Sequence, residues 1–162
     1  MNPIGFAHKL VPREQHRINL QTLIAHIEMQ PEHCVDMASW IRTDRSGKSP
    51  EQMISPACGT VACIGGWGLL AMYLRGLIKI NFADHSTRQL LGYRNSWGVI
   101  LTPIGVQVGE WLGLPEADAG KLFFGEWSTV RHADYEYFTD LSTYSKTEVL
   151  NELHYLLETG NV

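Results

Sequence analysis

Cysteine is scarce in this chain, and its few cysteines cannot form a fully paired set. The sequence contains three, Cys34, Cys58 and Cys63, so at least one thiol stays outside any disulfide within the chain. Small secreted proteins that depend on disulfides carry denser, even-numbered sets. The odd count therefore argues against a disulfide scaffold and favours a compartment in which the thiols stay reduced.

Long hydrophobic runs are also missing. The longest apolar segment, residues 61–74, contains three glycines and ends at Arg75, whereas a membrane-spanning helix needs about 20 apolar residues. The first residues, Met1 to Gly5, lack the basic stretch and apolar core of a secretory signal peptide. We therefore expect a soluble, cytoplasmic protein that does not insert into a membrane.

Strong charge of either sign and phosphate-binding motifs are absent as well. The formal net charge is −4, which argues against a surface built throughout for nucleic acid. No Gly-x-Gly-x-x-Gly or Gly-x-x-x-x-Gly-Lys-Ser/Thr motif follows an expected strand. We therefore assign no cofactor to the chain.

What the sequence does contain is the composition of one ordinary globular domain. The chain has 162 residues, of which 44% are hydrophobic and 19% charged, so it can bury a core without a metal or disulfide. No internal repeat or linker divides it, and we assign residues 1–162 to a single domain. Charge is unevenly spread, because residues 115–162 hold 9 acidic against 3 basic side chains.

Periodicity and capping patterns predict a mainly α fold. Helices are expected over residues 13–29, 60–74, 102–112, 114–123 and 145–159, with short helical segments at 36–41 and after Asp84 or Ser86. The clearest starts are Thr102-Pro103 and the capping box from Ser145 to Glu148. Alternating segments at 77–82 and 98–101 allow at most a minor two-stranded β ribbon. We expect a compact single-domain bundle of about six helices.

The helix expected from Thr60 to Leu74 is unusually rich in glycine. Gly65, Gly66 and Gly68 lie inside it, and each costs roughly 0.8–1 kcal/mol relative to alanine. The usual compensation is the close approach of a neighbouring segment or a ligand to the glycine surface. We therefore expect this helix to be the central one, with its neighbours packed against the glycines.

The same segment carries a resemblance to known proteins. It reads Cys-Gly-Thr-x-x-Cys-x-x-Gly-Trp from Cys58 to Trp67, after Asp-Met-x-x-Trp at residues 36–40 and before Leu-Gly-Leu-x-Glu-Ala-Asp at residues 112–118. The chain resembles a group of small uncharacterised bacterial and phage proteins that share the Cys-Gly-Thr-x-x-Cys core followed by Gly-Trp, over about residues 18–124. The resemblance implies a small helical protein of bacterial or phage origin and no particular activity.

A reactive thiol is the sharpest chemical hypothesis. Cys58 precedes the expected helix start and Cys63 lies in its first turn, where the positive end of a helix lowers the pKa of a thiol. His132, oriented by Asp134 or Asp140, could act as the general base of a cysteine-dependent hydrolase. Buried cysteines that act as small apolar side chains are more common, so catalysis is the alternative and we lean against an enzyme.

The same region could also form a zinc site or a site for a small anion. Cys34, Cys58, Cys63 and His33 have the chemistry of zinc ligands, but their spacing lacks the tight Cys-x-x-Cys knuckle and we assign no metal. A nucleotide or other small anion could bind at the helix start; the candidate residues are Arg42, Arg45, Gly59, Thr60 and Trp67. A solvated basic loop is the favoured explanation of these basic residues, and so few cations argue against nucleic acid as a partner.

The favoured function rests on the acidic, aromatic C-terminal third. The residues expected to contact a partner are Trp127, Asp134, Tyr135, Glu136, Tyr137 and Asp140. Aromatic side chains anchor protein interfaces and charges steer the partner, although the same aromatics could instead cover the core. We therefore predict a binding protein, an inhibitor or adaptor that acts on a host or bacterial protein with a basic surface.

Overall fold

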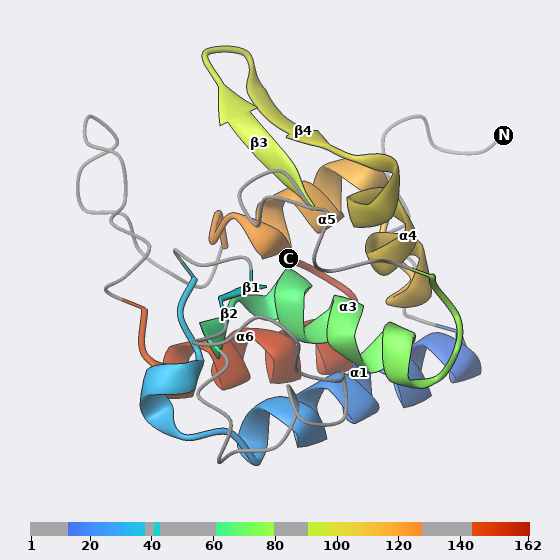
Figure 1. Ribbon diagram of the computed structural model, residues 1–162, viewed down its shortest axis with the longest axis vertical. Coiled ribbons are helices and arrows are strands. Elements are labelled where there is room, and N and C mark those ends of the chain that lie inside the picture. Colours follow the sequence, from blue (N-terminus) through green and yellow to red (C-terminus); the bar gives the residue numbers. More distant parts are fainter. Residues whose placement is uncertain (1–12, 38–40, 43–60, 80–90, 128–143) are drawn as a thin grey trace, which may run out of the picture.

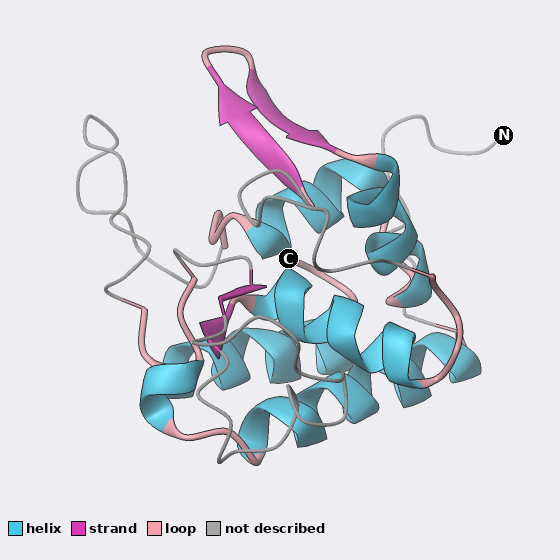
Figure 2. Cartoon of the chain, viewed as in Figure 1, coloured by secondary structure: helices cyan, strands magenta, loops and turns pink. Residues whose placement is uncertain are grey.

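A computed structural model of the chain shows a mainly helical protein, as predicted. It describes residues 13–37, 41–42, 61–79, 91–127 and 144–162. Five α-helices lie within this part of the chain: α1 (Glu14–Glu28), α3 (Ile64–Leu74), α4 (Pro103–Trp111), α5 (Glu116–Phe123) and α6 (Lys146–Thr159). A short 3-10 helix η1 (Glu32–Cys34) and the strands β1 (Ile41–Arg42), β2 (Val61–Ala62), β3 (Gly92–Asn95) and β4 (Gly98–Leu101) complete it. Helices dominate the body of the molecule (Figure 2).

Helix α3 occupies the centre of the fold, as the glycine content predicts. It contacts α1, α4 and α5, while α1 packs along α6. Figure 1 shows α3 between the α1/α6 pair and the α4/α5 pair. The buried apolar side chains of all these elements form one hydrophobic core. No helix in the described ranges is long and apolar enough to cross a membrane.

Close packing against the glycines of α3 explains why they are tolerated. A Cβ atom at Gly65 would lie 2.8 Å from Leu91 Cδ1 and 3.1 Å from Phe123 Cγ. A Cβ atom at Gly68 would lie 3.0 Å from Val108 Cγ1. Neighbouring side chains therefore fill the space that larger residues would need, and the expected compensation by close packing is confirmed.

The predicted start of this helix at Thr60 is wrong. Helix α3 begins at Ile64, and Cys63 is its N-cap residue, whose sulfur accepts a hydrogen bond from the Gly66 amide at 3.4 Å. Cys63 therefore precedes the helix and does not lie in its first turn. Thr60 lies outside the described residues.

Tertiary pairing explains the later start. Strand β2 pairs antiparallel with β1, with Ile41 opposite Ala62 and Arg42 opposite Val61. Val35 also bridges Ala62 in parallel. The backbone of residues 61–62 therefore pairs with distant segments and stays extended. The spacing of apolar residues along the helix cannot predict this pairing.

Two other local predictions need correction. The helical segment expected over 36–41 is wrong at its end, because Ile41 belongs to β1; Met37 and Ile41 are nevertheless buried, as expected. Strand β4 matches the segment predicted at 98–101, but its partner is β3 at 92–95. Residues 77–79 form no strand, and the helix expected after Asp84 or Ser86 lies outside the described residues, apart from its buried Leu91.

The helix ends predicted from capping patterns are confirmed. The Thr102 hydroxyl accepts a hydrogen bond from the Gly105 amide at 3.1 Å, and Ser145 and Glu148 form a complete capping box. Gly113 and Gly160 follow α4 and α6 with φ values of 78° and 71°, which glycine adopts without strain.

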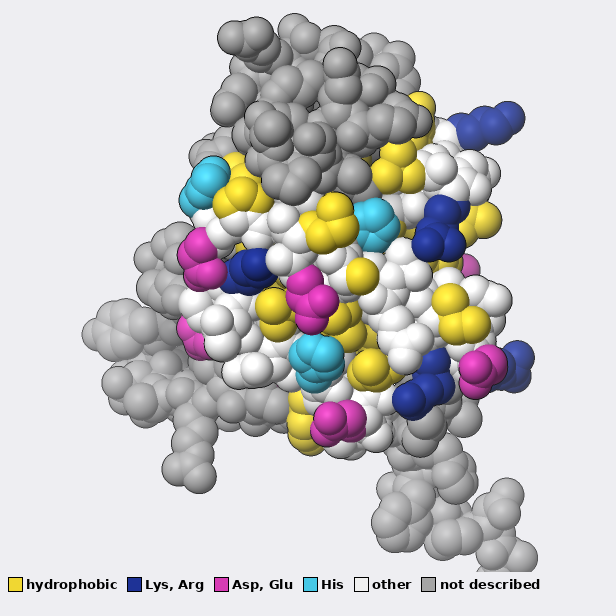
Figure 3. Space-filling model, turned by 90° about the horizontal axis from the view of Figure 1, so that it is seen from below, with side chains coloured by type: hydrophobic (Ala, Val, Ile, Leu, Met, Phe, Trp, Pro, Cys, Tyr) yellow, Lys and Arg dark blue, Asp and Glu magenta, His cyan; other side chains and the backbone are white. Residues whose placement is uncertain are grey.

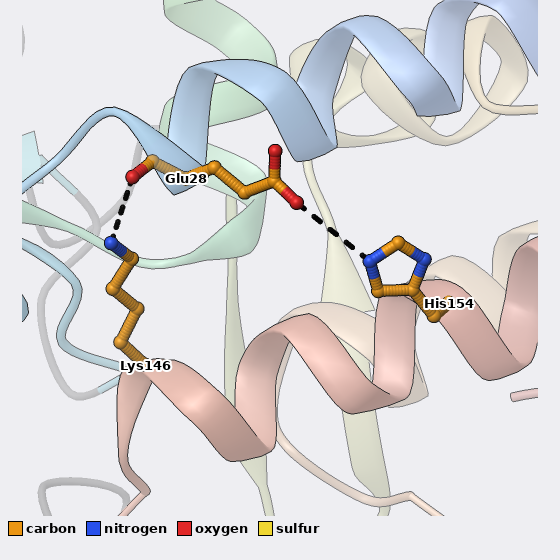
Figure 4. Close-up of polar contacts among 3 residues, drawn as sticks. All are labelled: Glu28, Lys146 and His154. Atoms are coloured by element: carbon orange, nitrogen blue, oxygen red, sulfur yellow. Dashed lines mark hydrogen bonds and ion pairs between the residues drawn. The ribbon is translucent and has the colours of Figure 1, made fainter.

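Lys146 joins the C-terminal end of α1 to the start of α6. Its Nζ donates hydrogen bonds to the carbonyl oxygens of Glu28 at 2.8 Å and Gln30 at 2.7 Å. About two turns further along α6, His154 Nε2 lies 3.8 Å from Glu28 Oε1 (Figure 4). A cation at the carbonyl end of a helix is stabilising, so Lys146 caps α1 from a neighbouring helix.

Candidate functional site

The structure places Cys63 where a nucleophile would be ineffective. The side chain is fully buried, and this burial raises the pKa of the Cys63 thiol to about 12, against the opposing effect of the Gly66 and Gly65 amides. The thiolate is the reactive form, and it is scarce at neutral pH at such a pKa. Cys58 and His132, with the candidate orienting residues Asp134 and Asp140, lie outside the described residues.

The remaining zinc candidates differ in environment. Cys34 is buried, whereas its neighbour His33 is exposed. Within the described ranges, no three His, Cys, Asp or Glu side chains lie together as a metal site requires. The described cysteines therefore act as core residues.

Trp67 is a core residue, and its predicted role in ligand binding stays a prediction. Its side chain is fully buried, and its indole Nε1 donates a hydrogen bond to the Cys34 carbonyl oxygen at 3.2 Å. Of the other anion-site candidates, Arg42 contributes its backbone to β1, while Arg45, Gly59 and Thr60 lie outside the described residues. Most of this predicted site therefore lies outside the described residues, and the site stays a prediction.

Trp127 is also buried, which corrects its predicted role as a partner-binding residue. The side chain is 2% exposed, and its Nε1 donates a hydrogen bond to the Leu122 carbonyl oxygen at 3.0 Å. Its ring centroid lies 4.6 Å from that of Tyr144, whose hydroxyl donates to the Gly125 carbonyl oxygen at 2.7 Å. These two aromatics cover the core, which is the alternative explanation of the aromatic tail.

The other predicted partner-binding residues are Asp134, Tyr135, Glu136, Tyr137 and Asp140, and all lie outside the described residues. An interface at these positions stays a prediction.

A feature that the sequence did not single out is the β3–β4 hairpin. Figure 1 shows it projecting from the body beyond α4 and α5. Its loop is the pair Ser96 and Trp97, between the register partners Asn95 and Gly98. The exposed fractions of three large side chains are 93% at Trp97, 49% at Tyr93 and 40% at Ile100. We refer to Tyr93, Trp97 and Ile100 as the hairpin patch.

The base of the hairpin is fixed to the body by close packing. The Thr102 amide donates a hydrogen bond to the Leu91 carbonyl oxygen at 3.0 Å. The residue before β3 is thereby joined to the residue after β4. Gly105 of α4 abuts the same carbonyl, which would overlap any side chain at that position. Leu91 and Leu101 are both buried. The hairpin therefore leaves the core from a defined position.

The strand alternation assigns one face of the hairpin to the body and the other to solvent. Val99 packs toward α5, where a Cβ atom at Gly120 would lie 3.3 Å from Val99 Cγ1. Tyr93 and Ile100 are directly opposite each other in the register, and residues paired in this way share a face. Their exposure places them on the outer face of the hairpin.

Trp97 is a large apolar side chain in the tight loop of the hairpin. Tight turns favour Gly, Pro, Asn, Asp and Ser, because these residues suit the backbone. A tryptophan that stays 93% exposed buries little apolar surface within its own chain. Asn95 and Gly98 around Ser96 and Trp97, followed by alternating residues 98–101, were the sequence signal for this hairpin, but exposure of the ring depends on the tertiary structure.

The hairpin stands on a helical pair that is rich in carboxylates. Residues 91–127 include four acidic and two basic side chains: Glu110, Glu116, Asp118 and Glu126 against Arg94 and Lys121. Glu116 and Glu126 are exposed and lie on either side of Gly120, the position in α5 that faces Val99.

Comparison with protein-family models found no match, and comparisons with curated proteins and with solved structures found none.

Proposed function

We propose that this chain is a protein-binding protein and that the hairpin patch is its contact surface. The observation that carries the proposal is the 93% exposure of Trp97 at the end of a projecting hairpin. An inhibitor or an adaptor, the two roles predicted from the sequence, would both act in this way. The proposal keeps the predicted class of function and transfers the contact surface from the C-terminal tail to β3 and β4.

The energetics of protein interfaces support this assignment. A tryptophan side chain buries on the order of 150–250 Å² when it is covered, and tryptophan is enriched among the residues whose truncation costs about 2 kcal/mol or more of binding energy. Tyr93 and Ile100 add two further exposed apolar side chains to the same hairpin. Because the hairpin base is packed against α4 and α5, little backbone freedom remains to be lost on binding.

Binding also fits the described thiols better than the alternative chemistry does. Cys63 is buried and holds the start of α3 through its bond with the Gly66 amide. A cysteine-dependent hydrolase would therefore depend on Cys58. Trp67, one of the residues predicted to bind a nucleotide at the same helix start, is part of the core.

The test combines site-specific cross-linking with affinity measurements. A photoreactive phenylalanine derivative replaces Trp97 in the full chain, and a second variant carries it at Met29, which is 59% exposed in another part of the molecule. Expression in cells of the source organism should give a cross-linked protein from position 97 and not from position 29. The partner is then identified by mass spectrometry and purified.

Truncation of the tryptophan should weaken binding to that purified partner. We expect Trp97→Ala to raise the Kd by about thirtyfold, which corresponds to about 2 kcal/mol. The matched control Met29→Ala should leave the Kd within about twofold, and both variants should keep the wild-type thermal unfolding profile because both side chains are exposed. Equal affinities of the two variants would refute the hairpin patch as the contact surface.

A further inference from the structure

We infer that Val99 is a positioning residue for the hairpin patch: by packing against Gly120 of α5, it holds the hairpin in the conformation that presents the patch to a partner. This inference rests on the proposed function and deepens it, because it gives the body-facing side of the hairpin a part in binding. It follows from the juxtaposition of a two-stranded sheet with a helix position that carries no side chain.

Strands β3 and β4 need support from outside their own pairing. They form a sheet of two strands, each four residues long. A hairpin of this kind is marginally stable in water by itself, and packing against a helix is one of the ways in which it becomes stable. The order of the hairpin therefore depends on its contacts with the body of the protein.

Helix α5 provides such a contact through Gly120. Strand β4 packs on α5, and a Cβ atom at Gly120 would lie 3.3 Å from Val99 Cγ1 and 3.5 Å from Val99 Cβ. Val99 is half-buried and belongs to the apolar side chains packed against the core. Because residue 120 has no side chain, the strand approaches the helix closely enough for Val99 to fill this space.

Val99 lies between the fixed base of the hairpin and its exposed loop. At the base, Leu91 and Leu101 are buried, and the Thr102 amide donates a hydrogen bond to the Leu91 carbonyl oxygen. Val99 is the next body-facing position of β4 toward the loop, since successive residues of a strand point to opposite faces and Ile100 is exposed. Val99 therefore supports the part of the hairpin that carries the loop.

Loss of this support should change association with the partner and not the bound complex. A partner binds only the fraction of molecules whose hairpin is ordered, so the apparent Kd rises in inverse proportion to that fraction. Once the complex has formed, Trp97 and the rest of the hairpin patch make the same contacts. A positioning residue therefore acts on kon, whereas truncation of a contact residue such as Trp97 acts mainly on koff.

The experiment compares two neutral polar substitutions at Val99, using the full chain and the purified cross-linked partner. Val99→Asn introduces a residue that is depleted in strands, whereas Val99→Thr keeps the branched shape and the strand preference. We expect Val99→Asn to lower kon about fivefold with koff within about twofold of wild type, and Val99→Thr to keep both rate constants within about twofold. Without the partner, amide hydrogen exchange over residues 92–101 should be at least about tenfold faster in Val99→Asn but not in Val99→Thr.

The matched control is Leu157→Ala, which removes a half-buried apolar side chain of α6, the helix that packs along α1. It should lower the free energy of unfolding in urea at least as much as Val99→Asn does. Its kon and its exchange over residues 92–101 should stay within about twofold of wild type. A loss of binding in this control would show that general destabilisation explains the effect and would refute the positioning role.

The outcomes also separate this inference from the proposed function. If Trp97→Ala weakens binding while Val99→Asn leaves kon and hairpin exchange unchanged, the contact surface stands and the positioning role is refuted. If Val99→Asn raises koff instead, Val99 contacts the partner directly and the inference also fails. If Trp97→Ala has no effect on the Kd, the proposed function itself fails, even where faster exchange in Val99→Asn shows that Val99 orders the hairpin.

Discussion

The environment of Cys63 shows how burial can outweigh a favourable position at the end of a helix. The Gly66 and Gly65 amides lower the pKa of the thiol, as amides at a helix start should, but removal from water acts more strongly in the opposite direction. The net result is a neutral thiol that accepts a hydrogen bond from Gly66. At this position the cysteine stabilises the helix start and gains no reactivity.

This explanation predicts slow modification of the buried thiols. In a Cys58→Ser variant only Cys34 and Cys63 remain, and both are buried. Their reaction with an aromatic disulfide reagent at mildly alkaline pH should be at least about 100-fold slower than that of free glutathione, because both thiols are buried and the raised pKa of Cys63 also keeps its thiolate scarce. Both thiols should react fully in denaturant, as followed by absorbance. Rapid reaction of either thiol in the folded protein would contradict the assignment.

Helix α3 and the hairpin are linked at the scale of elements. Leu91 stands directly before β3, its side chain packs against Gly65 of α3, and its carbonyl oxygen receives the Thr102 amide at the start of α4. One buried residue therefore connects the central helix with the base of the projecting hairpin. The glycine content of α3 serves this close packing.

An added methyl group at Gly65 should destabilise the protein. In Gly65→Ala the new Cβ would lie 2.8 Å from Leu91 Cδ1. Overpacking of a core typically costs about 1–3 kcal/mol, which exceeds the gain of about 0.8–1 kcal/mol in helix propensity. We expect a net loss of up to about 2 kcal/mol in the free energy of unfolding, measured with urea.

A second variant separates the clash from a general effect of the substitution. In a Leu91→Val background the clashing methyl group is removed, so Gly65→Ala should cost at least about 0.5 kcal/mol less than in the wild type. Equal costs in the two backgrounds would show that Leu91 is not the obstacle.

At the scale of the whole molecule, segments far apart in the sequence hold the two helical pairs around α3. Asn19 Nδ2 of α1 donates to the Trp111 carbonyl oxygen at the end of α4 at 2.7 Å, and Arg17 donates to the Leu157 carbonyl oxygen of α6 at 3.0 Å. Figure 3 shows the molecule from below, where charged and apolar side chains are interspersed over the described surface. The most exposed of the described large apolar side chains is Trp97 of the hairpin.

Stability should depend on pH through His26 of α1. Burial, together with the positive charge of Arg75, lowers the pKa of His26 from its ordinary value of 6.5. Between the lowered value and 6.5 the unfolded chain binds this proton and the folded chain does not. The contribution of His26 is therefore fully present above pH 6.5 and is lost as the pH falls below it.

Urea unfolding at a series of pH values tests this dependence. The wild type should lose stability below pH 6.5, and His26→Gln should reduce the slope of this loss, because the group that binds the proton is gone. The matched control is His33→Gln, at an exposed position in η1, which should retain the wild-type slope. Identical slopes for His26→Gln and the wild type would exclude His26 as a source of the dependence.

Helix ends were predicted best where they depend on capping residues close in the sequence. The capping box at Ser145, the Thr102-Pro103 start and the stops at Gly113 and Gly160 all depend on residues within a few positions of each other. The start of α3 depends on pairing between residues 41–42 and 61–62. No pattern around Thr60 contains that information, so the predicted boundary was wrong.

By itself, the amino-acid sequence determined the helical class, most helix ends and the central place of the glycine-rich helix, because capping, periodicity and glycine content act locally or require close packing. Only the tertiary structure decided which aromatic side chains are available to a partner. Trp67 and Trp127 are buried, whereas Trp97 is 93% exposed. The physical reason is that burial depends on which segments meet in space: the core encloses two of these indole rings, while the third lies in the loop of a hairpin that projects from it.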